Sequence, residues 1–364
     1  MEYRINRRTG DKISVLGFGS SYIAEAEEKE AIKAIRRGFE GGINYFDLAA
    51  AEGKAFSCFG EALSDVRNKV MFQVHFGADY HAGEYGWTTD GETIKRSIDW
   101  QLKMLKTDYI DYGFIHCLDE HSDWMDYQKG GAFAFLKQMK EEGVVRHIGM
   151  SSHTPAAIME IMDQVPVDML MFSVNPGYDY QKEEYARGSA DERTAVYQRC
   201  EKEGIGISVM KPFSGGQLLD GALSPFGRPL TIYQCLQYAL DRPGVLTVLP
   251  GMSTVSQVEQ MLGFFQASPE ERDYSLIASF QPAEVMGKCV YCNHCQPCPA
   301  GLNIGLINKY YDLAKQGDAM AVQHYRGLEV GADACVGCGH CDRRCPFGVK
   351  QSVRMKEIAQ YFAL

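Results

Sequence analysis

The sequence predicts two parts of different construction: a closed α/β barrel of eight parallel strands, followed by a small, cysteine-rich helical domain. Over the first 270 of 364 residues, eight short β-rich runs alternate with helical stretches. Eight such units in about 250 residues is the usual size of a (β/α)8, or TIM, barrel. Further along, eight of the twelve cysteines lie in two tight runs. We therefore place the barrel at residues 1–270, a linker at 271–288 and the second domain at 289–364.

The barrel strands are predicted from short apolar runs that no hairpin turn separates. These runs are residues 15–18, 44–46, 70–74, 109–115, 145–150, 169–172, 206–210 and 245–249. Helical periodicity between them predicts helices at 28–41, 93–105, 132–142, 155–164, 193–202, 232–240 and 255–264. An open, doubly wound sheet is the alternative, but it would need a third glycine after Gly17 and Gly19 to bind a dinucleotide.

Both ends of the chain add short elements. Arg8-Thr-Gly10-Asp is a turn signal, so residues 1–12 are predicted to form a hairpin that plugs the bottom of the barrel. In the C-terminal part, periodic apolar residues predict helices at 304–316, 319–326 and 350–361.

The composition argues against several partners. A net charge of −10 argues against nucleic acid, which binds a basic surface. No run of about eighteen apolar residues is present, so no membrane span is expected. The N-terminal Met1-Glu-Tyr-Arg-Ile-Asn-Arg-Arg lacks the apolar stretch of a signal peptide, and we expect a cytoplasmic protein.

The two cysteine runs have the spacing of iron–sulfur ligands. The second run ends before Pro346 and fits the C-x2-C-x2-C-x3-C-P pattern, whereas the first, before Pro299, is one residue short in its last gap. We predict two [4Fe-4S] clusters, and hence a protein that moves single electrons. In the ferredoxin topology each cysteine before a proline serves the other cluster. The predicted ligand sets are therefore Cys289, Cys292, Cys295 with Cys345, and Cys335, Cys338, Cys341 with Cys298.

Structural zinc is the rival interpretation, because C-x2-C pairs also bind zinc. Zinc sites usually use two pairs separated by a longer loop, rather than four cysteines in ten residues. Disulfides would require an oxidising compartment, which the N-terminus does not indicate.

Six stretches of the barrel part occur together in a known superfamily. They are Leu16-Gly-Phe-Gly19, Gly42-Ile-Asn-Tyr-Phe-Asp47, Asp108-Tyr-Ile-Asp-Tyr-Gly-Phe-Ile-His116, Arg146-His-Ile-Gly-Met-Ser151, Val209-Met-Lys-Pro-Phe-Ser-Gly-Gly216 and Val248-Leu-Pro-Gly-Met-Ser253. Over residues 1–265 the chain resembles the aldo-keto reductase superfamily, and its C-terminal extension resembles the ferredoxin-type tail of the iron–sulfur branch. The resemblance implies a TIM barrel, with a nicotinamide cofactor laid across the C-terminal ends of the strands.

The resemblance also implies a catalytic tetrad, which this chain carries in altered form. In the superfamily a tyrosine gives a proton to the carbonyl, a lysine paired with an aspartate assists it, and a histidine orients the substrate. Asp47 and His116 match the aspartate and the histidine. Glu52 stands where the tyrosine is expected and His75 where the lysine is expected. We predict that these four residues converge as the catalytic set at the barrel mouth.

The altered set leaves several chemistries open. An Asp47–His75 pair would hold the histidine charged, and a Glu52–His116 pair would shuttle a proton. A metal bound by His75, His116 and a carboxylate is one alternative. A barrel that has lost carbonyl reductase chemistry is another.

The cofactor positions implied by the resemblance are mixed. They are Ser151, Ser152, Asn175, Phe213, Ser214, Gly215, Gly216, Gly251 and Ser253. Ser152 replaces the usual asparagine of the nicotinamide site, whereas the glycines match a pyrophosphate-binding loop. No basic residue for a 2′-phosphate lies between Met252 and Met261, which favours NAD over NADP.

Aromatic and histidine side chains follow the third and fourth strands, in segments expected to be loops over the mouth that shape the substrate pocket. They are Tyr80, His81, Tyr85, Trp87, His121, Trp124 and Tyr127. Cys117 directly follows His116 and is expected to line the same pocket, as a structural thiol unless a nearby cation activates it.

These observations predict an iron–sulfur oxidoreductase that acts on a small organic substrate, of carbonyl or hydroxyl type, at the barrel mouth. Its clusters would exchange electrons with a ferredoxin or a flavoprotein. Two alternatives stay open: a redox-neutral acid–base lyase or isomerase with structural clusters, and a non-catalytic electron-transfer subunit with a relic barrel.

Overall fold

The computed structural model describes residues 1–180, 186–274, 276–277, 289, 295–315, 319–345 and 348–363. The chain divides into two compact units, each considered by itself. The first comprises Met1–Asp179 and Gly188–Phe280, and the second comprises Tyr180–Arg187 and Gln281–Leu364. The predicted boundaries near residues 270 and 289 stay predictions, because most residues between them lie outside the described ranges.

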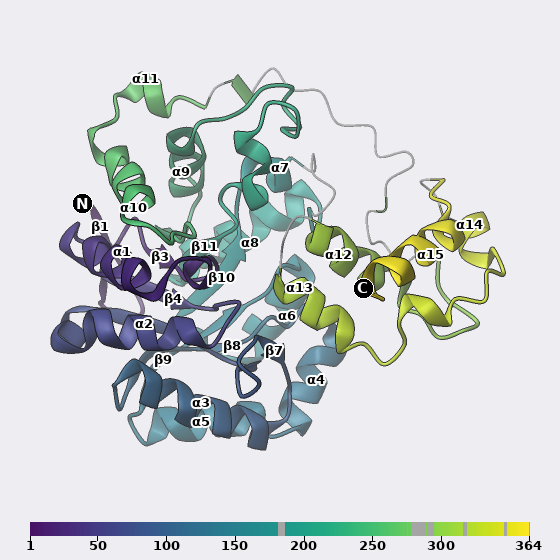
Figure 1. The fold of residues 1–364 in the computed structure, drawn as a ribbon, viewed down its shortest axis with the longest axis horizontal. Helices are drawn as coiled ribbons and strands as arrows, with labels where there is room; N and C mark the ends of the chain where they lie inside the picture. Colours follow the sequence, from purple (N-terminus) through teal and green to yellow (C-terminus); the bar gives the residue numbers. More distant parts are fainter. Residues whose placement is uncertain are drawn as a thin grey trace. The chain divides into compact units, whose positions relative to one another are not determined.

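Within the described residues, eight parallel strands form the barrel (Figure 1). In order of hydrogen bonding they are β3 (Phe18–Gly19), β4 (Tyr45–Leu48), β5 (Met71–Phe76), β8 (Ile110–Ile115), β9 (Val145–Ser151), β10 (Met169–Ser173), β11 (Gly206–Met210) and β12 (Val245–Val248). Parallel bridges from Leu16 to Val248 and from Gly19 to Gly251 join the two ends of the sheet. The predicted TIM barrel is confirmed, and the open doubly wound sheet is wrong.

Glycines permit the approach that closes the barrel. A Cβ on Gly17 would lie 2.6 Å from the Leu249 side chain, and one on Gly19 would lie 2.9 Å from the Leu249 carbonyl oxygen. Instead, Gly17 N donates to Val248 O and Gly19 N donates to Pro250 O, each at 2.9 Å. The two glycines of the incomplete dinucleotide motif therefore serve strand pairing.

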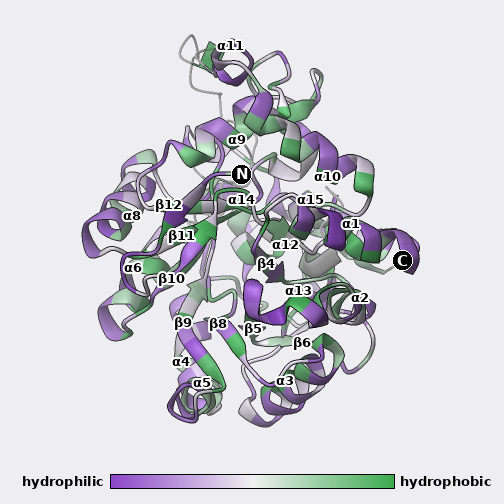
Figure 2. Ribbon diagram, turned by 90° about the vertical axis from the view of Figure 1, so that its left-hand side faces the viewer, coloured by the Kyte–Doolittle hydropathy of each residue, from purple (hydrophilic) through white to green (hydrophobic). Residues whose placement is uncertain are grey.

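Helices surround the strands (Figure 2). They include α1 (Glu28–Glu40), α2 (Lys54–Leu63), α3 (Gly91–Leu105), α5 (Ala132–Glu141), α6 (Pro155–Gln164), α8 (Ala190–Glu203), α9 (Ile232–Leu240) and α10 (Val255–Leu262). Apart from α2, each matches a predicted helix. Periodicity misses α2 because seven of its ten residues are buried, so the helix has no broad polar face.

The segments that follow β5 and β8 contain further elements. These are a hairpin of β6 (Ala78–Asp79) and β7 (Gly86–Trp87), and the helix α4 (His121–Lys129). Placing His121, Trp124 and Tyr127 in a loop is therefore wrong, because all three belong to α4. Trp124 and Tyr127 are buried, and Tyr127 donates to the Phe76 carbonyl oxygen at 2.7 Å. These two aromatic side chains pack the helix onto the barrel.

The predicted N-terminal hairpin is confirmed. Strand β1 (Tyr3–Ile5) pairs antiparallel with β2 (Lys12–Ser14). The turn between them contacts the barrel interior, because the Tyr112 hydroxyl donates to Asp11 Oδ2 at 2.5 Å and lies 3.0 Å from Thr9 Oγ1. The hairpin therefore packs against inward-facing side chains of the barrel.

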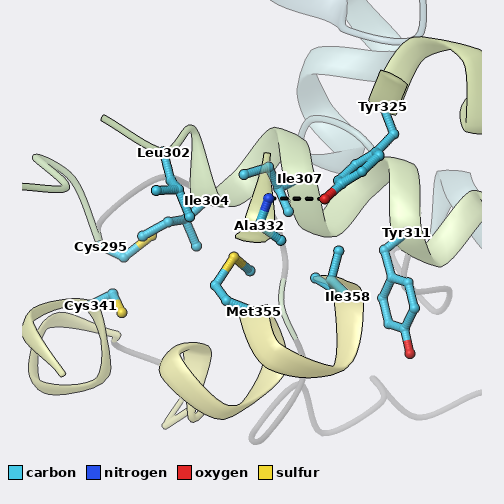
Figure 3. Packing of buried hydrophobic residues seen from close by; sticks show 10 residues of the cluster. All are labelled: Cys295, Leu302, Ile304, Ile307, Tyr311, Tyr325, Ala332, Cys341, Met355 and Ile358. Atoms are coloured by element: carbon cyan, nitrogen blue, oxygen red, sulfur yellow. Dashed lines mark hydrogen bonds between the residues drawn. The ribbon is translucent and has the colours of Figure 1, made fainter. Parts of the chain in front are cut away.

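The second unit is helical. Its described helices of four residues or more are α12 (Ile304–Lys315), α13 (Ala319–Arg326), α14 (His340–Arg344) and α15 (Gln351–Phe362). Figure 3 shows its core, in which side chains of α12 and α15 pack against Cys295, Cys341 and Tyr325. Over the whole described part of the chain, no helix has the length and apolar character needed to cross a membrane.

A buried ion pair ties the segment before β5 to β8. Arg67 Nη2 lies 2.6 Å from Asp111 Oδ2, and the two side chains are 9% and 2% exposed. Arg67→Ala should lower the free energy of unfolding by about 3–5 kcal/mol, because the Asp111 carboxylate stays buried with one fewer partner. Urea unfolding followed by circular dichroism measures this change.

An exposed pair provides the matched control. Arg36 Nη1 lies 2.8 Å from Asp65 Oδ1, with 36% and 63% of the side chains exposed. Arg36→Ala should change the free energy of unfolding by less than about 1 kcal/mol, because water solvates both charges. Equal losses in the two variants would contradict the structural role of Arg67.

Candidate functional site

A continuous chain of hydrogen-bonded side chains lies at the C-terminal ends of the barrel strands. Asp47 Oδ1, on β4, lies 2.7 Å from Nε2 of His75 on β5. The other ring nitrogen of His75, Nδ1, lies 2.9 Å from Nδ1 of His116, which follows β8. His116 Nε2 in turn lies 2.7 Å from the hydroxyl of Tyr85. None of the four residues is more than 5% exposed, so the chain is sheltered from water.

Strand periodicity explains how the first members meet. Alternate residues of a barrel strand point inward, so Asp47 follows Tyr45 and His75 follows Gln73 on the interior face. Gln73 Nε2 donates to Asp47 Oδ1 at 2.8 Å, and its Oε1 accepts from the Tyr45 hydroxyl at 2.8 Å. Gln73 therefore fixes the Asp47 carboxylate that faces His75. The predicted Asp47–His75 pair is present in the structure.

Glu52 does not join this chain. Its side chain is 46% exposed, and its carboxylate lies 3.4 Å from Lys54 Nζ. The structure therefore brings together Asp47, His75 and His116, but not Glu52. The expected Glu52–His116 pair is replaced by the contact between His116 and Tyr85.

Backbone pairing brings Tyr85 to this place. The loop after β4 runs beside the tip of the β6–β7 hairpin, where Gly53 N donates to Gly83 O at 2.8 Å. Tyr85 N donates to Ala51 O at 3.0 Å, and Glu52 pairs with Glu84 in an antiparallel bridge. Tyr85 thus lies beside Glu52, the position at which the resemblance implies a tyrosine. The sequence predicts only that Tyr85 lies in a loop that lines the pocket. No local pattern of residues reveals that this loop pairs with the segment after β4.

A second tyrosine of the hairpin has a different role. The Tyr80 hydroxyl donates to the Ala50 carbonyl oxygen at 3.1 Å. Burial raises the pKa of Tyr80, and the Asp47 carboxylate raises this pKa further. Tyr80 therefore stays a neutral hydrogen-bond donor that supports the loop after β4.

Three residues expected at the nicotinamide cofactor site have protein partners. Ser152 is fully buried, and its Oγ donates to Asp119 Oδ1 at 3.0 Å. Asn175 Nδ2 donates to the Lys211 carbonyl oxygen at 2.9 Å. Ser151 ends β9, and its Oγ accepts from Cys117 N at 2.7 Å. These side chains brace the loops around the mouth.

The loop after β11 has backbone suited to a phosphate. Ser214, Gly215 and Gly216 have φ angles of 51°, 64° and 94°. No atom lies within 4 Å of the place that a Cβ on Gly216 would occupy. Backbone N–H groups in such a turn can approach a phosphate closely. The loop that begins at Phe213 therefore fits the pyrophosphate expected there.

Protein side chains already cap the start of α10. Glu30 Oε1, from α1, accepts from Val255 N at 3.1 Å. Gln257 Oε1 accepts from Ser253 N at 2.7 Å and from Thr254 N at 3.2 Å. A carboxylate at this helix start repels a phosphate, whereas it accepts hydrogen bonds from ribose hydroxyls. The arrangement fits an adenosine ribose better than a 2′-phosphate.

In the second unit, cysteines from both runs line one pocket. They are Cys298, Cys335, Cys338 and Cys341, which is one of the two predicted ligand sets. Gly337 and Gly339, with φ of 65° and 66°, turn the second run around this pocket. Thiols that surround one space in this way fit the binding of one cluster.

The other predicted set is described only in part. Cys289 is buried and Cys345 is half-buried, whereas Cys292 lies outside the described residues. Cys295 is buried in the core of the unit, close to Cys341 in Figure 3.

Among the described residues, one ligand atom from each of Cys117, Asp119 and His153 lies within 4.8 Å of the other two. The expected metal bound by His75, His116 and a carboxylate stays a prediction.

Comparisons with known proteins agree with this geometry. A model of the aldo/keto reductase family matches residues 15–226, and a model of a 4Fe-4S dicluster domain matches residues 285–349. L-galactose dehydrogenase from Arabidopsis thaliana is 26% identical, over 71% of this chain and 86% of the relative. Methylglyoxal reductase YeaE from Escherichia coli K12 is 22% identical, over 78% and 96%. The holo form of an aldo-keto reductase from Bacillus halodurans superimposes with a TM-score of 0.63 at 25% identity, covering 78% of this chain and 97% of that structure.

Proposed function

The chain belongs to the aldo/keto reductase family, and we propose that it is an iron–sulfur oxidoreductase that interconverts a small carbonyl compound and its alcohol. The observation that carries this proposal is the buried chain from Asp47 through His75 and His116 to Tyr85. An aspartate, a histidine and a tyrosine thus follow one another where the family resemblance implies an aspartate, a lysine and a tyrosine. The relatives named as a dehydrogenase and a reductase support the same class of reaction.

One assignment of protons along this chain makes Tyr85 an acid. His75 donates through both ring nitrogens, to Asp47 and to His116, and so carries a positive charge. His116 accepts at Nδ1 and donates from Nε2 to the Tyr85 oxygen. The Tyr85 hydroxyl then directs its own proton towards a substrate oxygen.

This assignment explains how the residues assist reduction. A bound nicotinamide supplies the hydride that reaches the carbonyl carbon. Tyr85 gives its proton to the carbonyl oxygen, and the negative charge that develops on Tyr85 is stabilised by His116 and by the charge on His75. Exclusion of water strengthens each of these interactions. For oxidation of the alcohol, the proton moves in the opposite direction.

The backbone around the mouth supports a dinucleotide. The open turn at Ser214, Gly215 and Gly216 suits a pyrophosphate, and Glu30 at the start of α10 suits ribose hydroxyls. We therefore propose NAD rather than NADP as the nicotinamide cofactor.

The second unit supports a single-electron function. We propose two [4Fe-4S] clusters with the ligand sets given above, exchanging electrons with a ferredoxin or a flavoprotein. The pocket lined by Cys298, Cys335, Cys338 and Cys341 supports the exchange of ligands between runs, and the match to a 4Fe-4S dicluster domain supports clusters over zinc. The redox-neutral alternative is motivated by Glu52 and His75 in place of the tyrosine and the lysine. The exposed pair of Glu52 with Lys54 argues against Glu52 as its base.

Replacing Tyr85 tests the proton donor. Tyr85→Phe should lower kcat for carbonyl reduction by about 10²- to 10⁴-fold, because the proton donor is lost. The measurement is NADH oxidation with a panel of small aldehydes and ketones, methylglyoxal among them, alongside the Kd of NADH, which should not change.

Two control variants accompany this test. Tyr80→Phe removes a buried hydroxyl that donates to the Ala50 carbonyl oxygen, and Glu52→Gln removes the carboxylate at the expected tyrosine position. Both should retain kcat within about threefold, as expected for groups that give no proton in the transition state. A larger loss of kcat in Glu52→Gln than in Tyr85→Phe would identify Glu52, rather than Tyr85, as the proton donor.

Replacing Glu30 tests the choice of cofactor. Glu30→Gln should raise the ratio of kcat/KM for NADPH to that for NADH by about 10-fold, because it removes a negative charge from the helix start. Glu259→Gln, which removes a carboxylate elsewhere on α10, should leave this ratio unchanged. An unchanged ratio in Glu30→Gln would argue against binding of the adenosine end at α10.

Iron analysis tests the clusters. Anaerobically purified protein should contain about eight irons and eight labile sulfides per chain. Cys338→Ser should lose about half of both, whereas Cys58→Ser, on α2, should lose neither. Zinc without sulfide in the purified protein would be incompatible with electron transfer by the second unit.

A further inference from the structure

A thiol, a carboxylate and an imidazole meet beyond the ends of β8 and β9, and we propose that they bind one Zn²⁺ ion. The residues are Cys117, Asp119 and His153, and one ligand atom from each lies within 4.8 Å of the other two. This combination of sulfur, nitrogen and oxygen ligands is one that zinc accepts. None of the three residues belongs to the hydrogen-bonded chain from Asp47 to Tyr85 or to the two cysteine runs. The inference is therefore independent of the proposed reaction.

The distances are close to those of a tetrahedral site. Cys117 Sγ lies 3.9 Å from His153 Nδ1, and His153 Nδ1 lies 3.1 Å from Asp119 Oδ2. Zinc–ligand bonds of the usual lengths at tetrahedral angles require about 3.6 Å between sulfur and nitrogen and about 3.4 Å between nitrogen and oxygen. Small side-chain rotations are enough to bring the three atoms around one ion.

Asp119 is oriented by partners on its other oxygen. Its Oδ1 accepts from Ser152 Oγ at 3.0 Å and from His153 N at 2.6 Å, which directs Oδ2 towards the imidazole. Such outer hydrogen bonds are typical of carboxylates that bind a metal, because they fix the geometry of the ligand. The carboxylate is also buried, at 3% exposure, where a cation would compensate its charge.

The backbone holds the thiol in an uncommon conformation. Cys117 has φ of 52°, in the left-handed region that residues other than glycine rarely adopt. The hydrogen bond from Cys117 N to Ser151 Oγ, at 2.7 Å, contributes to holding this conformation. Residues held in this way concentrate at functional sites, where the conformation directs a side chain. Here it directs the sulfur towards His153.

The alternative is an ordinary histidine–carboxylate hydrogen bond with a thiol nearby. A comparison is available in the same molecule, since His81 forms such a pair with Asp79 on the hairpin, and no third ligand joins that pair in the described residues. At His153 the thiol completes a set of three. Three protein ligands leave the fourth tetrahedral position for water or a substrate oxygen, as in catalytic zinc sites. Binding would release the thiol proton of Cys117 to solvent.

The test uses the full-length protein, purified anaerobically with its iron–sulfur clusters and equilibrated with buffered zinc. We expect one zinc per chain by elemental analysis. We also expect a zinc X-ray absorption spectrum with one sulfur neighbour at about 2.3 Å among nitrogen and oxygen neighbours. Cys117→Ala and His153→Ala should each weaken zinc binding by more than about 100-fold, and Ser152→Ala by about 10-fold.

Control variants separate this site from other thiols and imidazoles. His81→Ala and Cys58→Ala should leave zinc stoichiometry and affinity unchanged. The proposal is overturned if the wild-type protein takes up no zinc, or if Cys117→Ala binds zinc as tightly as the wild type. A spectrum with four sulfur neighbours would also overturn it, because the zinc would then lie in the cysteine runs. The spectrum of the wild type decides the question even where a variant fails to fold.

Discussion

Closure of the barrel is the constraint on which the site depends. The first and last strands pair through the backbone of Gly17 and Gly19, at positions where a Cβ would collide with Leu249. Because all strands of a closed parallel barrel end at one rim, side chains from β4, β5 and β8 face one another there. Asp47, His75 and His116 meet for this reason, although they are far apart in the sequence.

The buried hydrogen-bonded chain from Asp47 to Tyr85 also stabilises the rim of the barrel. Polar groups removed from water destabilise a fold unless each finds a partner. Both ring nitrogens of His75 and of His116 have partners, and Gln73 supplies another to Asp47. A partner lost at any step would leave a buried polar group unsatisfied, so the residues proposed to move the proton also hold the rim together.

The cysteines of the two units have different surroundings. In the second unit, Cys295 and Cys341 belong to the hydrophobic core, next to Met355 and Ile304 (Figure 3). As proposed ligands that are also core residues, they would link cluster binding to folding of that unit. In the first unit, Cys117 lies instead at the rim of the barrel, where its sulfur is 3.9 Å from His153 Nδ1.

The sequence by itself determined the eight strands, most of the helices, the family and the Asp47–His75 pair. Apolar periodicity reports which face of an element is buried, and parallel strands bring their ends together in a fixed way. Only the tertiary structure decided that Glu52 points outward, that Tyr85 reaches His116, and that Glu30 caps α10. These contacts arise from loop segments and helix ends that pair over long sequence distances, and no local pattern of residues encodes such pairing.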